Sequence, residues 1–137
     1  MTSKKFVKAF IAGMSLPAVI LPIVFTLLYL NVHAIVMQRA LEFIPMYLPL
    51  VWGFANALFV KFNNDATGKK ANKGLIITGL VLGLLVAIFG VFIAHIPMRV
   101  FGNSMQEMQY APLVVIPVVY AILFRYVVRW LNKVVGL

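Results

Sequence analysis

The chain has 137 residues and a formal net charge of +9, and 64% of its residues are hydrophobic whereas only 11% are charged. With a mean hydropathy of +1.02, this composition excludes a soluble domain with a polar surface, so we expect most of the apolar surface to face lipid. The length fits a single transmembrane domain over residues 1–137, and the absence of cysteine excludes disulfides, thiolate catalysis and cysteine-ligated metals.

Four long apolar runs cover residues 6–30, 43–60, 74–96 and 112–131. Each is close to the ~20 residues that an α-helix needs to cross a hydrocarbon layer of ~30 Å. The sequence therefore predicts an all-α integral membrane protein with four transmembrane helices. The first run is longer than the apolar region of a signal peptide, which usually has about 7–15 residues, so we expect this helix to be retained.

The positive charges lie mainly on one side of these runs. Ten of the twelve Lys and Arg residues occupy the N-terminal segment, the connection between the second and third runs and the C-terminal end, and the other two connections hold only Arg39 and Arg99. Short loops rich in Lys and Arg stay in the cytoplasm, so both termini are predicted to be inside (N-in/C-in) in a multi-pass protein of the cell membrane, which we assign to a bacterial inner membrane.

Anionic lipid headgroups are the expected partner of these charges. Nucleic acid is not, because few polar or aromatic side chains that could read bases surround them. The residues assigned to the lipid contact are Lys69, Lys70, Lys73, Arg125, Arg129 and Lys133.

The first predicted helix contains Pro17 and Pro22 but no acidic residue. Each proline removes a backbone donor and favours a bend. Bent helices around a cleft are one interpretation, and the general frequency of proline in transmembrane helices is the other. Proton-coupled exporters of this size depend on an acidic side chain in the first helix, so that class is excluded.

The second predicted helix carries Asn56 near the expected membrane mid-plane. An unpaired amide there would cost several kcal/mol. Trp52 precedes it by one turn and shares its face. One interpretation is a hydrogen bond from Asn56 to another helix, and the other is a polar path that Asn56 and Trp52 line together with Tyr120 of the fourth helix.

Small residues follow one face of the third predicted helix. They recur at steps of 4, 4, 3 and 4, which places them within an arc of about 80° at ~100° per residue. They are Gly79, Gly83, Ala87, Gly90 and Ala94. Because small residues let helix backbones approach closely in lipid, we expect tight packing on this face, inside the bundle or at a seam between copies.

The fourth predicted helix ends in Arg125, Arg129 and Lys133, which are spaced i, i+4 and i+8. The three acidic residues of the chain all lie in connections or at helix ends, so none is available as a partner within the membrane. Snorkelling of Arg125 to lipid phosphate is therefore the expected arrangement. An anion site is the alternative.

A shift of 68 residues aligns the first two predicted helices with the last two and places Pro49 on Pro117. The match describes two tandem helical hairpins, 1–68 and 69–137, related by an axis along the membrane normal. The alternative is that two unrelated hairpins share a basic inner end and an aromatic belt.

The chemistry-bearing motifs of enzymes are absent. The sequence has no P-loop, no paired intramembrane carboxylates and no nucleophile with an adjacent base, so we expect no enzyme and no cofactor. The two histidines, His33 and His95, are too few ligands to predict a metal site. The sequence favours an accessory or assembly component that acts through helix contacts, as a homo-oligomer or in a larger membrane complex. The alternative is a small oligomeric transporter or channel for a small solute.

Overall fold

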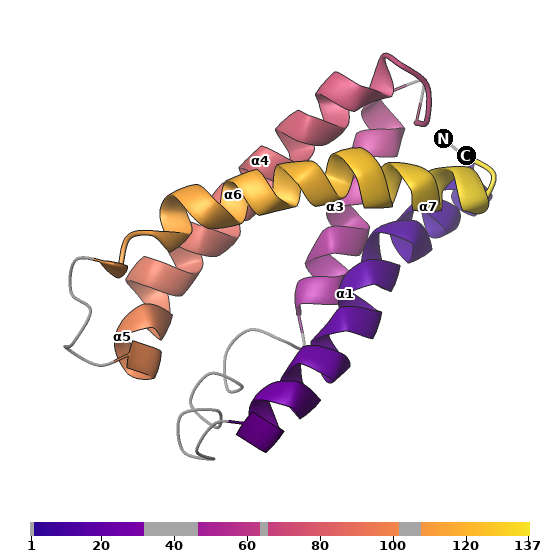
Figure 1. Ribbon diagram of the computed structural model, residues 1–137. Helices are drawn as coiled ribbons and strands as arrows, with labels where there is room; N and C mark the ends of the chain where they lie inside the picture. The colour runs from indigo at the N-terminus through magenta and orange to yellow at the C-terminus, as the bar shows by residue number, and fades with distance from the viewer. Residues whose placement is uncertain (1, 32–46, 64–65, 102–107) are drawn as a thin grey trace.

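The computed structural model describes residues 2–31, 47–63, 66–101 and 108–137 (Figure 1). All regular structure in these ranges is helical, which confirms the all-α prediction. The elements are α1 (Ser3–Asn31), α3 (Leu48–Phe62), α4 (Ala71–Ile88), the π-helical segment η1 (Phe89–Ile93), α5 (Ile96–Phe101), α6 (Pro112–Leu123), the π-helical segment η3 (Phe124–Val128) and α7 (Arg129–Val134).

Within the described residues, three helical stretches are long and apolar enough to cross a membrane: Ser3–Leu27, Ala71–Ile93 and Pro112–Val134. They correspond to the first, third and fourth predicted helices and are compatible with a multi-pass membrane protein. The second prediction, 43–60, corresponds to α3, which is apolar but has 15 residues. Residues 43–46 of that prediction lie outside the described ranges.

Prolines begin two of these helices. Pro49 lies in the first turn of α3 and Pro112 begins α6. A proline costs little there because the first N–H groups of a helix have no intrahelical acceptor. By contrast, Pro17 and Pro22 lie inside α1, which nevertheless continues through both.

The third and fourth predicted helices each contain a π-helical segment, η1 and η3. In η1 the N–H of Ala94 donates to the carbonyl of Phe89 at 2.9 Å, an i to i+5 bond that replaces the usual i to i+4 bond. This stretch stops before the predicted end at residue 96, because His95 adopts a φ of +49°, where a helix cannot continue. The short helix α5 then begins at Ile96.

The helices form two pairs, α1 with α3 and α4 with α6, and each pair is much more extensively packed internally than against the other. The pairs meet at the end of the molecule where both chain termini lie, and they diverge towards the opposite end (Figure 1). The core at the junction of α3, α4 and η3 is apolar. Its largest fully buried side chains include Leu75, Phe124 and Val128.

Candidate functional site

The backbones of α1 and α3 touch where two glycines face each other. A Cβ atom on Gly13 would lie 2.5 Å from the carbonyl oxygen of Trp52, and one on Gly53 would lie 2.8 Å from the ring of Phe10. No side chain fits at either glycine without movement of its neighbours. This crossing therefore depends on the absence of side chains, as close helix contacts in lipid commonly do.

Beside this crossing, two asparagines form a buried polar pair, which we call the asparagine clasp (Asn56 and Asn132). Asn56 Nδ2 donates to Asn132 Oδ1 at 2.7 Å, and Asn132 Nδ2 donates to Asn56 Oδ1 at 3.1 Å. Asn56 Nδ2 also donates to the carbonyl oxygen of Ala9 at 2.7 Å. Both side chains have 0% exposure. The clasp therefore links α1, α3 and α7 through polar groups that satisfy each other away from water.

The pair α4 and α6 meets in a second glycine contact. A Cβ on Gly79 would lie 2.5 Å from the carbonyl oxygen of Tyr120, and a Cβ on Gly83 would lie 2.6 Å from the Cα of Pro117. The predicted small face of the third helix thus packs inside the molecule at these two positions. Among its other members, Ala87 and Ala94 are buried, whereas a Cβ on Gly90 would meet its nearest neighbour, Ile96, at an ordinary 3.7 Å.

Aromatic rings join the two pairs. The ring of Trp52 meets the ring of Tyr120 edge-on, with 4.8 Å between centroids, and lies at the same distance from Phe124. Trp52 is buried, and its indole nitrogen has no hydrogen-bond partner in the part of the chain that the structure describes. Of the predicted path residues, Trp52 and Tyr120 therefore contact each other, while the side chain of Asn56 is hydrogen bonded to Asn132 in the clasp.

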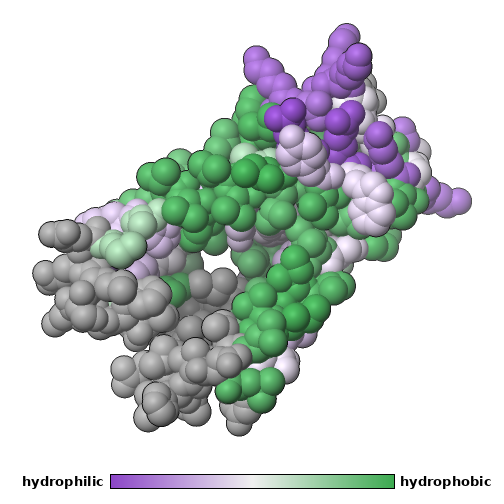
Figure 2. Space-filling view, viewed as in Figure 1, coloured by the Kyte–Doolittle hydropathy of each residue, from purple (hydrophilic) through white to green (hydrophobic). Residues whose placement is uncertain are grey.

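Hydrophilic side chains gather at the end where the termini lie, and hydrophobic side chains cover the visible surface of the helices away from that end (Figure 2). We call the end with the termini the basic end. Arg129 is tied into this end: its Nε donates to the carbonyl oxygen of Thr67 at 2.7 Å and its Nη1 to Asn72 Oδ1 at 2.8 Å. The guanidinium of Arg125 is exposed and lies 5.1 Å from the ring of Tyr126. The remaining side chains assigned to lipid contact are exposed; they are Lys69, Lys70, Lys73 and Lys133.

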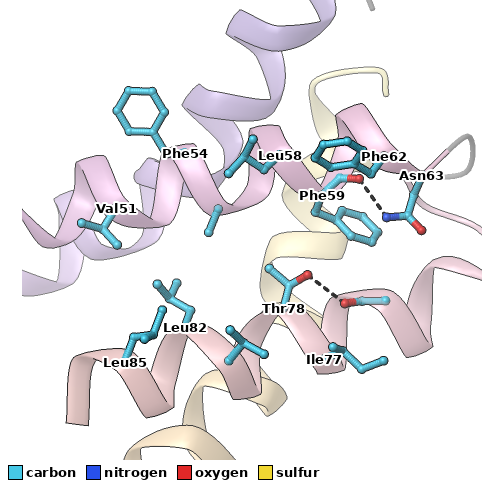
Figure 3. A pocket seen from close by; sticks show the side chains of 13 residues that line it. Val51, Phe54, Leu58, Phe59, Phe62, Asn63, Ile77, Thr78, Leu82 and Leu85 are labelled. Carbon is cyan, nitrogen blue, oxygen red and sulfur yellow. Dashed lines mark hydrogen bonds between the residues drawn. The ribbon is translucent and has the colours of Figure 1, made fainter. Parts of the chain in front are cut away.

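An apolar groove of about 620 Å³ runs between α3 and α4 (Figure 3). We call it the α3–α4 groove. Phe62 and Asn63 lie at one end of the view, and Val51 and Leu85 lie at the other. A second hollow of about 360 Å³ shares Val51 and Leu85 with the groove and extends it towards Phe89.

Sequence reasoning missed Asn132 and the α3–α4 groove. Asn132 stands between two cations and resembles part of the basic end. Its spacing identifies it, because a buried face of the fourth helix passes through Ala121, Phe124, Val128 and Asn132 at steps of 3, 4 and 4. The groove has no such signal, since its walls consist of ordinary apolar residues.

Among the described residues, no group of three or more His, Asp or Glu side chains lies close enough together to hold a metal ion. His33 lies outside them, so its position relative to His95 is not described. No protein family model matches the chain, and no curated protein or solved structure is significantly similar to it.

Proposed function

We propose that the protein is an accessory or assembly component of a membrane, which acts through helix–helix contacts as a homo-oligomer or within a larger complex. The observation that carries this proposal is the burial of Asn56. Its side chain has 0% exposure, and both of its amide atoms are hydrogen bonded. Its partners, the Ala9 carbonyl and the Asn132 side chain, belong to the helix ends near the two chain termini. This polar group therefore joins three helical segments towards the basic end, and in this conformation no solute can reach it.

The proposal includes four crossings, with both termini on the cytoplasmic side of the cell membrane. It is supported by the gathering of hydrophilic side chains at one end (Figure 2). Lys8 and Gly136 approach each other there, since a Cβ on Gly136 would lie 3.5 Å from the Nζ of Lys8. A cation-rich end stays in the cytoplasm.

A single-cysteine variant tests this orientation cleanly, because the chain has no cysteine of its own. Lys70→Cys should react with a membrane-impermeant maleimide only after cells are permeabilised, since Lys70 is an exposed residue of the basic end. Labelling in intact cells would contradict the orientation. Leu80→Cys, on an exposed apolar position of α4, is the control that should remain unlabelled in both cases if α4 lies in lipid.

The two helical pairs are proposed to be tandem hairpins, 1–68 and 69–137. Trp52 and Tyr120 are 68 positions apart in the sequence, and their rings contact each other. Equivalent positions of two repeats meet in this way at an axis that relates the repeats. This contact supports a duplication with the axis along the membrane normal.

The function is tested by mass and by flux on the same preparation. We expect the protein, extracted in mild detergent and transferred to lipid discs, to have a mass above that of one 15.3 kDa chain, or to retain a partner protein. A strict monomer without a partner would contradict an assembly role.

Flux measurements test the alternative, an oligomeric transporter or channel. That function requires Asn56 to leave the asparagine clasp. Solute flux through reconstituted vesicles that is lost in Asn56→Leu, but kept in a variant of an exposed position such as Leu84→Ala, would favour transport. We expect no flux above that of empty vesicles.

A further inference from the structure

The α3–α4 groove is lined almost entirely by apolar residues, and its two polar side chains, Asn63 and Thr78, each donate a hydrogen bond to a backbone carbonyl. Asn63 Nδ2 donates to the carbonyl of Phe59, and Thr78 Oγ1 donates to the carbonyl of Gly74, each at 2.9 Å. These donors offer little to a polar solute. An occupant of the groove must therefore be a hydrocarbon over most of its length.

The groove is long enough to hold a lipid acyl chain from one leaflet of a bilayer. Its walls run over residues 51–63 of α3 and residues 74–85 of α4. At ~1.5 Å per residue these stretches rise by about 17 Å, which is close to half of a ~30 Å hydrocarbon layer. The second hollow carries the walls on to Tyr47 and Phe89, so an acyl chain of one leaflet fits within the groove along its length.

Positive charge stands at one end of the groove. The Nζ of Lys61 lies 5.6 Å from the centre of the Phe62 ring, and that ring forms part of the groove wall. Lys73 precedes Gly74, which lines the same end, and the side chains of Lys61 and Lys73 are both exposed. Each of the two helices therefore carries an exposed cation next to a residue that lines this end of the groove, a combination that suits an anionic headgroup above an acyl chain.

We propose that the α3–α4 groove binds one anionic phospholipid from the leaflet at the basic end of the molecule. One acyl chain lies between α3 and α4, from Phe62 towards Val51. The phosphate lies at Lys61 and Lys73. This lipid is a specific ligand, distinct from the general attraction of the basic end to a charged surface, and it does not depend on the assembly role proposed above.

The headgroup is tested by lipid retention. Protein in detergent is titrated with equal amounts of dioleoylphosphatidylglycerol and dioleoylphosphatidylcholine, and native mass spectrometry counts the lipids that remain bound. We expect one phosphatidylglycerol to be retained in preference to phosphatidylcholine. Lys61→Ala should weaken it by about fivefold, and Lys61→Ala with Lys73→Ala by about 25-fold.

The matched control is Lys4→Ala, which removes the same charge from an exposed residue of α1 that does not line the groove. It should leave retention of phosphatidylglycerol within about twofold of the unmodified protein. Equal retention of the two lipids, or an equal loss in Lys4→Ala and Lys61→Ala, would overturn the proposal, because the charges would then act without a defined site.

The acyl chain is tested by filling the groove. Ala55 lines its wall, and Ala55→Phe should abolish retention of the preferred lipid while leaving the far-ultraviolet circular dichroism of the protein unchanged. Ala18→Phe, on an exposed position of α1, is the matched control and should retain the lipid. Retention in Ala55→Phe at the level of Ala18→Phe would overturn the assignment of the groove, and loss in both would do so too.

A second copy of the chain is the competing occupant. Leu58 lines the groove and is 49% exposed. We expect Leu58→Cys to form no disulfide-linked dimer under oxidising conditions in lipid discs, because the lipid keeps two grooves apart. A disulfide-linked dimer formed in high yield would show that a second copy occupies the groove and would overturn the lipid proposal.

Discussion

Each of the two helical pairs is held by a glycine that lies against a backbone carbonyl of the other helix, but the residues next to this contact differ between the pairs. In the pair α1 and α3, Gly13 lies against the carbonyl of Trp52, and in the pair α4 and α6, Gly79 lies against the carbonyl of Tyr120. Both glycines would place a Cβ 2.5 Å from that oxygen. Direct approach of the backbones is therefore the common element, as expected where packing, and not exclusion of water, drives helix association.

The pairs differ at the position one turn further along. Asn56 follows Trp52 by four residues, and the equivalent position after Tyr120 is Phe124. Asn56 bonds to Asn132 of the fourth helix, whereas Phe124 contacts Trp52 of the second. At these equivalent positions, the first pair thus contacts the second through the amide of Asn56, and the second pair contacts the first through the ring of Phe124. Glycines hold each pair together, and the clasp and the aromatic rings hold the pairs to each other.

The largest effect is expected from adding a side chain at a glycine contact. Gly83→Leu should destabilise the protein by about 3 kcal/mol, because even a Cβ would lie 2.6 Å from the backbone of Pro117 and neither helix can yield locally. Gly13→Leu should be similarly damaging in the other pair, where the neighbour is the backbone of Trp52. Unfolding in mixed micelles of increasing dodecyl sulfate content measures both.

The control for this prediction lies on the same helical stretch. Gly90 is also buried, but a Cβ there would find its nearest neighbour at 3.7 Å, in ordinary van der Waals contact. Gly90→Ala should therefore change stability much less than Gly83→Ala. Equal effects of the two alanine variants would mean that helix propensity, and not the contact with α6, determines the cost.

Much of this framework follows from the sequence alone. Hydropathy predicts the three long membrane helices, because an uninterrupted apolar run of that length has few other uses. Asn56 admits two interpretations in sequence, and its hydrogen bonds match the interhelical one. Its partner cannot be predicted from local pattern, since Asn132 stands 76 residues away and becomes a neighbour only when the two pairs meet.

The divergence of the pairs and the two π-helical segments are likewise features that local sequence pattern does not predict. Nothing in the run from Phe89 to Ile93 distinguishes it from ordinary apolar helix by composition. The α3–α4 groove lies between two helices, and hydropathy does not encode how two helices pack against each other. Sequence reasoning therefore identifies which faces pack, and the structure identifies what they pack against.

The asparagine clasp should have the second largest effect. Asn56→Leu keeps the number and branching of heavy atoms but leaves the amide of Asn132 buried without its partner, so we expect a loss of about 1–2 kcal/mol. Asn132→Leu should cost a similar amount. The double variant should cost clearly less than the sum, because no amide is then left unpaired.

The same unfolding assay measures these three variants as a double-mutant cycle. Additive losses would show that the two asparagines act independently and would contradict the clasp. Asn63→Leu is the matched control. Its amide lies at an exposed position and donates to the carbonyl of Phe59 in its own helix, so the change should be close to neutral.

A smaller and more local effect is expected at Arg129. Arg129→Lys keeps the charge but cannot donate to Thr67 and Asn72 at once in the fixed geometry of a guanidinium. We expect a loss of about 1 kcal/mol and faster hydrogen exchange of backbone amides in residues 66–72. Arg125→Lys, at an exposed position, should leave that exchange unchanged. Equal protection in both variants would contradict a role of Arg129 in fixing this connection.

The smallest effect is expected where the two pairs touch through Trp52. Trp52→Phe keeps a ring against Tyr120 and Phe124 but leaves a cavity that costs about 1 kcal/mol. It also removes a buried indole N–H that has no acceptor among the described residues, a group whose burial costs about 1–3 kcal/mol. The two terms oppose each other, so stability should change by less than about 1 kcal/mol or rise slightly.

Trp130→Phe, at a position 60% exposed, controls for loss of an indole without burial. If Trp52→Phe instead destabilised the protein by more than about 2 kcal/mol while Trp130→Phe did not, the indole N–H would have a hydrogen-bond partner inside the protein, and the junction would be held by a hydrogen bond as well as by rings.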